Sequence, residues 1–166
     1  MRAVVVVLAM LAGTAHADDR GFTWGAFAGP GYDSGTGYRT GFDLEVGQRI
    51  DNIEWAIAPR LMVIRSAYGN TNVFEAMALL RVFVVPRTYV EVAGGMAFLA
   101  GETGGDFIHL PDVQPAVSLG VGYNLVRSQR WLLDVRALYM LDVGFRVDND
   151  KSTLHGILVG PALRFY

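Results

Sequence analysis

The sequence predicts an all-β fold, namely an eight-stranded antiparallel up-and-down transmembrane β-barrel. Three observations lead to this prediction. Large apolar residues alternate with small or charged ones in eight segments, and a period of two is typical of strands. The connections between these segments are alternately long and short, as in outer-membrane barrels. After the N-terminal 17 residues, no stretch approaches the roughly 18 uncharged apolar residues of a spanning helix.

The eight predicted strands differ in how clearly they alternate. The first (22–32) and the last (154–166) are the weakest, and the six between them show one apolar face each. The predicted strands are 22–32, 38–50, 53–64, 74–84, 88–99, 113–125, 131–143 and 154–166. Each of the six clear strands has one apolar face. In chain order, these faces consist of Phe42, Leu44 and Val46; Ile53, Trp55, Ile57, Leu61 and Val63; Phe74, Ala76, Ala78, Leu80 and Val82; Val90, Val92, Met96 and Phe98; Val113, Val117, Leu119, Val121, Tyr123 and Leu125; and Trp131, Leu133, Val135, Tyr139 and Leu141.

Two kinds of connection join these strands. The longer ones are polar and rich in Gly, Asn and Asp, and they cover residues 32–37, 66–72, 100–112 and 144–153. Short turns at 51–52, 85–87 and 127–130 lie between them. Pro30, Pro59, Pro115 and Pro161 fall inside predicted strands, on the apolar face. Because proline cannot donate to a ladder, we expect these positions to mark bulges or strand ends.

The composition excludes several classes of protein. Of the 166 residues, 52% are hydrophobic and 18% charged, which suits one domain with a large core and excludes a disordered tail. A net charge of −2 provides no basic footprint, so a nucleic-acid partner is not expected. There is no cysteine, which excludes disulfides, zinc–thiolate sites and thiol catalysis. No residue cluster predicts a metal or another cofactor.

The first 17 residues have the pattern of a secretory signal peptide. Arg2 gives a positive start, residues 3–11 are apolar, and Ala15-His16-Ala17 has the small-x-small form of a cleavage site. The apolar run is about half of what a spanning helix needs. We therefore predict that residues 1–17 are a signal peptide and that residues 18–166 form the barrel domain of an exported protein.

Whether the apolar face points outward separates a membrane barrel from a soluble one. An eight-stranded barrel has room inside only for modest side chains, so the large residues belong outside, against lipid. Aromatic residues near segment ends suit membrane–water interfaces. They are Phe22, Trp24, Tyr32, Tyr38, Trp55, Phe74, Tyr89, Phe98, Tyr123, Trp131, Phe165 and Tyr166. The alternative is a soluble, lipocalin-like periplasmic barrel with its apolar residues around an internal cavity.

The opposite face carries charges that a membrane barrel would enclose. An isolated buried charge costs several kcal/mol, so these groups are expected to pair, and the planar guanidinium suits bidentate pairing with carboxylates. We predict an Arg–carboxylate network that plugs the lumen; in the plainer interpretation the charges only fill space and set the strand register. The predicted members are Asp43, Glu45, Glu54, Arg60, Glu75, Arg81, Glu91, Asp134, Arg136 and Arg164.

The C-terminal residues resemble the assembly signal of bacterial outer-membrane proteins. Gly160, Leu163 and Phe165 match its spacing, whereas Tyr166 is an additional residue and Leu158 stands where a polar residue is usual. With the signal peptide and the size, the chain resembles the small eight-stranded outer-membrane barrels of the OmpX or OmpA transmembrane-domain type. The resemblance implies a porin-like fold in a Gram-negative outer membrane, four loops at the cell surface, contact with outer-membrane lipid, and recognition by the barrel assembly machinery through the last strand. A monomer is expected.

Function is predicted to be non-enzymatic, either structural or through loop interactions at the cell surface. The longest loop contains an apolar patch, Phe107-Ile108-His109-Leu110, which is a candidate interaction site or packs over the barrel mouth. The alternative is an enzyme that modifies lipid A in the outer leaflet, with His155 and Ser152 at the rim as base and nucleophile. The His-x-Ser motif of such deacylases is missing, because Gly156 and Ile157 follow His155.

Overall fold

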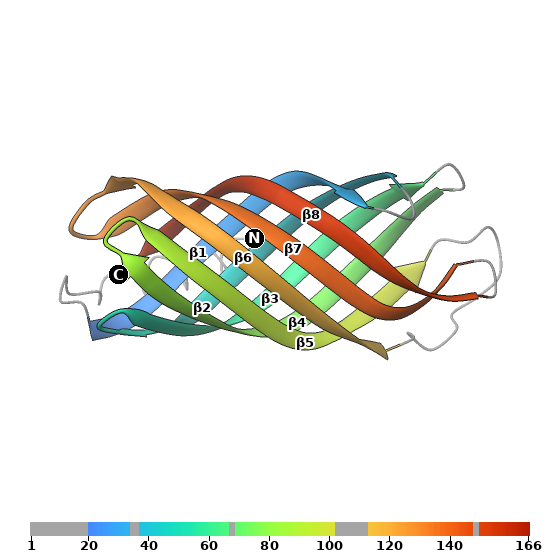
Figure 1. Ribbon diagram of the computed structural model, residues 1–166, viewed down its shortest axis with the longest axis horizontal. Coiled ribbons are helices and arrows are strands. Elements are labelled where there is room, and N and C mark those ends of the chain that lie inside the picture. Colours follow the sequence, from blue (N-terminus) through green and yellow to red (C-terminus); the bar gives the residue numbers. More distant parts are fainter. Residues whose placement is uncertain (1–19, 34–36, 67–68, 102–112, 148–149) are drawn as a thin grey trace, which may run out of the picture.

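A computed structural model describes residues 20–33, 37–66, 69–101, 113–147 and 150–166, with side chains except at 20, 66, 69–71, 99–101, 142–147 and 150–154. Eight antiparallel strands pair in chain order and close into a barrel, as predicted (Figure 1). The strands are β1 (Arg20–Asp33), β2 (Gly37–Ile50), β3 (Ile53–Ser66), β4 (Gly69–Val85), β5 (Thr88–Gly101), β6 (Val113–Arg127), β7 (Trp131–Val147) and β8 (Asp150–Phe165).

The β2–β3, β4–β5 and β6–β7 turns and the C-terminus lie at one end of the barrel, the short-turn end (Figure 1). The strand ends that the other four connections join lie at the opposite end, the loop end. The predicted long loops at 66–72 and 144–153 are wrong, and the one at 32–37 shortens to residues 34–36, so that only the connection at 102–112 is long. β4 already begins at Gly69, and β7 and β8 continue their pairing to Val147 and Asp150. The added residues of β4 and β8 are mostly polar and carry no hydrophobic alternation, which backbone pairing does not require. Those of β7 do alternate, with Phe145 and Val147 on either side of Arg146.

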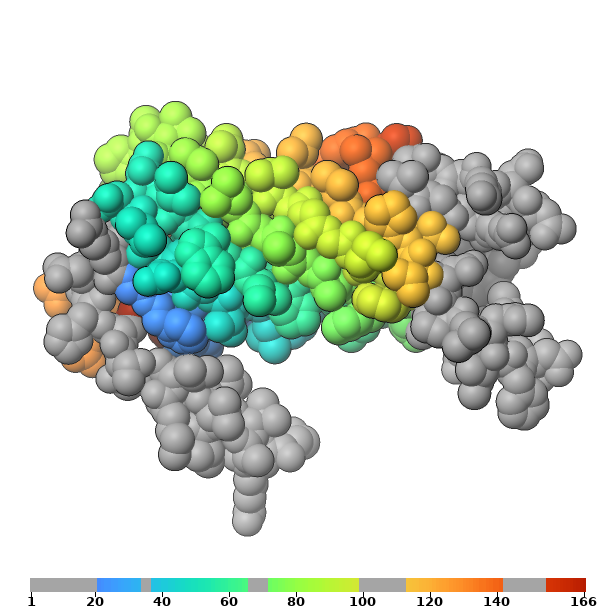
Figure 2. Space-filling view, turned by 90° about the horizontal axis from the view of Figure 1, so that it is seen from below, coloured from blue at the N-terminus to red at the C-terminus, as the bar shows by residue number. Residues whose placement is uncertain are grey.

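The outer wall is apolar. Its side chains alternate with buried ones along each strand, and Trp55, Ile57 and Leu119 are 47%, 61% and 51% exposed. Figure 2 shows one side of this wall, over β3 to β6. Among the strand side chains that the structure describes, the exposed Asp, Glu, Lys, Arg and His residues are Arg65, Arg127 and His155, all toward strand ends. The described residues include no helix of the length and apolarity that crossing a membrane requires.

The interior contains an apolar layer as well as charges. Phe27, Met62, Met140 and Leu158 are at most 1% exposed and belong to one cluster of buried hydrophobic side chains. The barrel is therefore filled by side chains, as expected for eight strands.

Tyr89 is a correction to the predicted aromatic girdle. It is 0% exposed and lies inside the barrel, because it precedes the outward-facing Val90 and so takes the inner face of β5. Its cross-strand partner is Gly122, where a Cβ atom would overlap the Tyr89 ring. The missing side chain at residue 122 makes room for a large ring in a narrow lumen.

The prolines are a second correction. The register shifts lie at Phe83/Val85, Asn124/Val126 and Val143/Phe145, and none of them is at a proline. Only Pro115, the third residue of β6, lies near a strand end. Pro30 and Pro161 both fall where the β1–β8 pairing is interrupted, between Phe27–Ala162 and Gly31–Leu158. Pro59 likewise lies in a gap of the β2–β3 pairing and stays in register with Ala76 of β4. Each proline thus pairs with one neighbouring strand; Pro30, Pro59 and Pro161 lie in gaps of the other ladder, and Pro115 precedes the first β6–β7 pair.

Candidate functional site: an ionic network inside the barrel

All ten charged residues predicted for the lumen lie on the inner face, and each is at most 3% exposed. Strict alternation positions them, because residues of equal parity on one strand share a face. They come from six of the eight strands: Asp43 and Glu45 on β2, Glu54 and Arg60 on β3, Glu75 and Arg81 on β4, Glu91 on β5, Asp134 and Arg136 on β7, and Arg164 on β8.

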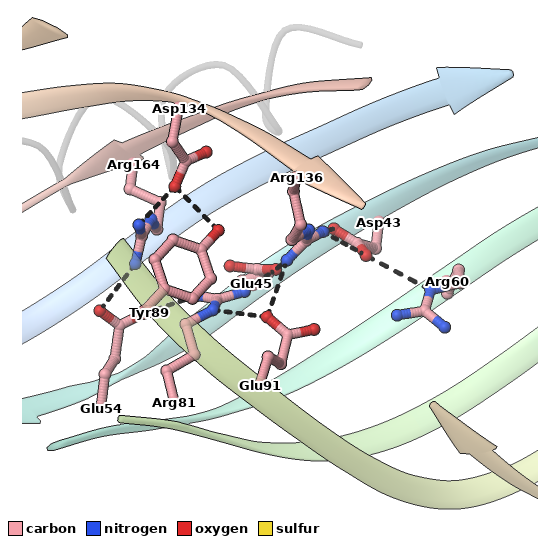
Figure 3. Close-up of polar contacts among 10 residues, drawn as sticks. All are labelled: Asp43, Glu45, Glu54, Arg60, Arg81, Tyr89, Glu91, Asp134, Arg136 and Arg164. Carbon is pink, nitrogen blue, oxygen red and sulfur yellow. Dashed lines mark hydrogen bonds and ion pairs between the residues drawn. The ribbon is translucent and has the colours of Figure 1, made fainter. Parts of the chain in front are cut away.

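Arg164 joins two carboxylates near the short-turn end. Its Nη1 atom donates to Oε2 of Glu54 at 3.1 Å, and its Nη2 atom donates to Oδ2 of Asp134. The Tyr89 hydroxyl donates to the same Asp134 oxygen at 2.9 Å (Figure 3). The Arg164 guanidinium also lies 4.6 Å from the centroid of the Tyr89 ring, within cation–π range. The buried phenol is therefore a member of the network that the charge pattern alone did not predict.

Arg81 is the first of two central hubs. Its three guanidinium nitrogens donate to three different carboxylates: Nη1 to Glu54 at 2.7 Å, Nε to Glu91 at 2.6 Å and Nη2 to Glu45 at 2.5 Å. These glutamates come from β3, β5 and β2, so one side chain of β4 connects both of its neighbours and a strand beyond them. Arg81 therefore cross-links four strands through its side chain.

Arg136 is the second hub, and it reaches across the lumen from β7. Its Nη2 atom is 2.8 Å from both carboxylate oxygens of Asp43, and its Nη1 atom donates to Glu45 and, at 3.3 Å, to Glu91. The Phe27 ring lies under the guanidinium at 4.2 Å from its centroid. β2 and β7 are not neighbours in the barrel, so these bonds hold opposite walls together.

Arg60 extends the network toward the loop end. Its Nε atom donates to Asp43 at 3.3 Å and its Nη1 atom donates to Glu75 at 3.1 Å. All ten charged residues and Tyr89 are thereby connected into one network, and Figure 3 shows its members other than Glu75 along the lumen. Such an arrangement neutralises charge and fills space.

Three further charged residues on the inner face were not predicted. Arg39 and Asp33 pair with each other and are both 0% exposed, and Arg49 is 8% exposed. Arg39 also donates to the Met140 sulfur at 3.5 Å. The alternation on β2 already indicated the inward position of Arg39 and Arg49, since both share the parity of Asp43. The described buried side chains thus include seven carboxylates and six arginines, a smaller excess of acid than the predicted six and four.

The residues of the predicted C-terminal signal lie where the last strand meets the first. The Phe165 ring stacks on Trp24 of β1 with 4.2 Å between centroids, and Leu163 faces outward. A Cβ atom on Gly160 would overlap the carbonyl oxygen of Ala28 on β1. The Tyr166 hydroxyl accepts a bond from Arg49 at 3.3 Å. These contacts give the residues structural roles in closing the barrel, and their recognition by assembly machinery stays a prediction.

Gly160→Ala is expected to lower the folded fraction of the barrel, because the added methyl group would push β8 away from β1. Gly94→Ala is the matched control, since a Cβ atom on Gly94 would meet nothing within 4 Å. The folded fraction can be measured on a gel without boiling, where folded barrels migrate differently from unfolded ones. Equal folded fractions for the two variants would contradict the close approach at Gly160.

The other predicted sites are less fully described. Phe107, Ile108, His109 and Leu110 lie outside the described residues. His155 faces outward near the loop end, with its Nδ1 atom 2.9 Å from the Tyr139 hydroxyl. The Ser152 side chain lies outside the described side chains. Within the described ranges, no group of three or more His, Asp or Glu side chains is placed to hold a metal ion.

A closed eight-stranded barrel with an apolar wall and a charged, filled lumen has the architecture of a small transmembrane β-barrel. The chain has the fold of the small outer-membrane barrels. It is similar to the crystal structure of Neisserial surface protein A, with a TM-score of 0.60 and 19% identity over 87% of this chain and 96% of that one. It is also similar to a de novo designed transmembrane β-barrel, with a TM-score of 0.51 and 15% identity over 86% of this chain and 94% of that one. No protein-family model matches the sequence, and neither does the sequence of any curated protein.

Proposed function

We propose that the chain is an integral outer-membrane protein of a Gram-negative bacterium. The observation that carries this proposal is the distribution of side chains, with large apolar residues outside and paired charges inside, as bilayer-embedded barrels require. The lipocalin-like alternative needs an apolar cavity inside, and the structure has the opposite arrangement. Export through residues 1–17 is part of the proposal.

The proposed topology follows from the two ends of the barrel. The short-turn end with the C-terminus faces the periplasm, and the loop end, which carries the long connection at 102–112, faces the exterior, as is usual in this class. A surface role through these loops is supported by the similarity in fold to a protein that is itself named a surface protein. The patch at 107–110 is the proposed interaction site. We also propose a monomer that the barrel assembly machinery recognises through β8.

We propose a non-enzymatic role. His155 contacts Tyr139 on the outer wall, and a phenol beside an imidazole does not by itself assemble a nucleophile, a base and an oxyanion site. The polar groups inside the barrel face one another in ion pairs, which suits a structural function.

The proposal predicts that the lumen does not conduct. Arg81 and Arg136 join carboxylates of different strands across it, and an eight-stranded barrel has no room for both this network and a water-filled channel. The purified protein, incorporated into planar bilayers, is expected to show no stepwise conductance, whereas a 16-stranded porin in the same bilayers gives open channels. Stable channel openings that require the folded protein would contradict a plugged lumen.

A further inference from the structure

A small cavity opens at the short-turn end, between the β4–β5 turn and the end of β6. It has a volume of about 180 Å³ and is lined by Pro86, Arg87, Asn124, Leu125 and Arg127. This anion pocket, as we call it, is separate from the ionic network, and neither arginine belongs to the predicted lumen residues. Among the described residues that line it, two are arginines and none is acidic.

Hydrogen bonds hold the two sides of the anion pocket together. The backbone N–H of Asn124 donates to the carbonyl of Arg87 at 2.7 Å, and the Asn124 side-chain amide donates to the carbonyl of Pro86 at 3.3 Å. Asn124 is only 3% exposed, and its Oδ1 atom has no hydrogen-bond partner among the described residues. The pocket is thus built on a buried amide whose N–H groups are already fixed by the two carbonyls, so the arginines are the groups that can donate to an anion.

The bulge between Asn124 and Val126 shapes the outer side of the pocket. The register with β7 shifts there by one residue, so Leu125 and Val126 are both exposed, at 51% and 46%. Arg127, which is also exposed, follows directly. Leu125 belongs to the apolar wall, whereas Arg87 lies in a turn at the barrel end. The anion pocket therefore lies at the boundary between the apolar wall and the polar rim.

We propose that the anion pocket binds the phosphate of a phospholipid headgroup in the membrane leaflet at the short-turn end. Arg87 and Arg127 would donate to the phosphate oxygens, for which the guanidinium fork is well suited. The acyl chains would then lie along Leu125 and the wall. A free phosphate is also an anion, but it has no acyl chain to contact the apolar wall. This inference rests on the proposed membrane location.

The test measures lipid binding to the folded barrel in detergent by native mass spectrometry. The probes are dioleoyl phosphatidylglycerol and dioleoylglycerol, which lacks the phosphate. The double variant Arg87→Gln/Arg127→Gln is compared with the wild type and with Arg65→Gln, which removes an exposed arginine at the opposite end of the barrel. Since each arginine near an anionic lipid contributes about 1 kcal/mol, the double variant should bind the phospholipid about 10- to 30-fold more weakly.

The wild type and Arg65→Gln should bind phosphatidylglycerol alike and in preference to dioleoylglycerol. Unchanged binding by the double variant, or equal binding of both lipids, would overturn the proposal. Inorganic phosphate, added as a third probe, should compete weakly; displacement of the lipid at equal concentration would assign the pocket to free phosphate instead. A gel without boiling verifies that each variant is folded, and fractionation of cells tests the membrane location separately.

Discussion

Replacing Arg136 by alanine is expected to lower the free energy of unfolding by about 3–5 kcal/mol, the usual cost of removing one partner of a buried ion pair. Arg136 donates to Asp43, Glu45 and Glu91, all of which are at most 3% exposed. Without it, three carboxylates lose a shared cation while Arg60 and Arg81 remain. The barrel also loses the ion pairs by which Arg136 joins β7 to Asp43 and Glu45 of β2.

The measurement is equilibrium unfolding by urea in lipid vesicles, followed by tryptophan fluorescence. Arg65→Ala is the control, because it removes an exposed arginine and should change stability by no more than about 0.5 kcal/mol. Adding Glu45→Gln to Arg136→Ala should recover part of the loss, since one uncompensated charge disappears. If Arg136→Ala were as stable as Arg65→Ala, the network would have only a space-filling role.

Leu119→Arg is expected to destabilise the protein in a bilayer by about 2–4 kcal/mol, the cost of an arginine on the lipid face near the midplane. Leu125→Arg should cost about 0–1 kcal/mol, because it lies near the short-turn end of the same strand. Both leucines are 51% exposed, so they differ in depth and not in burial by protein. Unfolding in vesicles measures both variants. Equal and small effects would indicate that the wall faces water.

Much of the fold could be predicted from the sequence, because a strand with one buried face repeats its hydrophobicity every second residue. The inward placement of Glu54, Arg81 and Asp134 follows from that period alone. The polar ends of β4 and β8 could not be predicted, since pairing there has no apolar signal, whereas the alternation of Phe145 and Val147 did indicate a longer β7. Tyr89 was assigned to the girdle from its residue type, although its parity with Glu91 already placed it inside.

The partners within the network could not be predicted in the same way. Which carboxylate Arg136 meets depends on the stagger of the closed barrel, which brings β7 opposite β2. The anion pocket depends on a register shift after Asn124. The residues that follow, Leu125, Val126 and Arg127, include no proline or glycine that would indicate a bulge. The prolines, by contrast, predicted bulges or strand ends that the structure does not have at Pro30, Pro59 and Pro161. Each of these prolines lies in a gap of one neighbouring ladder, and the register is the same on both sides of the gap.

The most direct test of the membrane-barrel assignment is fractionation of expressing cells, followed by electrophoresis of each fraction with and without boiling. The apolar wall and the ionic network predict a band in the outer-membrane fraction whose mobility changes on heating. A protein released with the soluble periplasm, with the same mobility in both samples, would contradict the assignment.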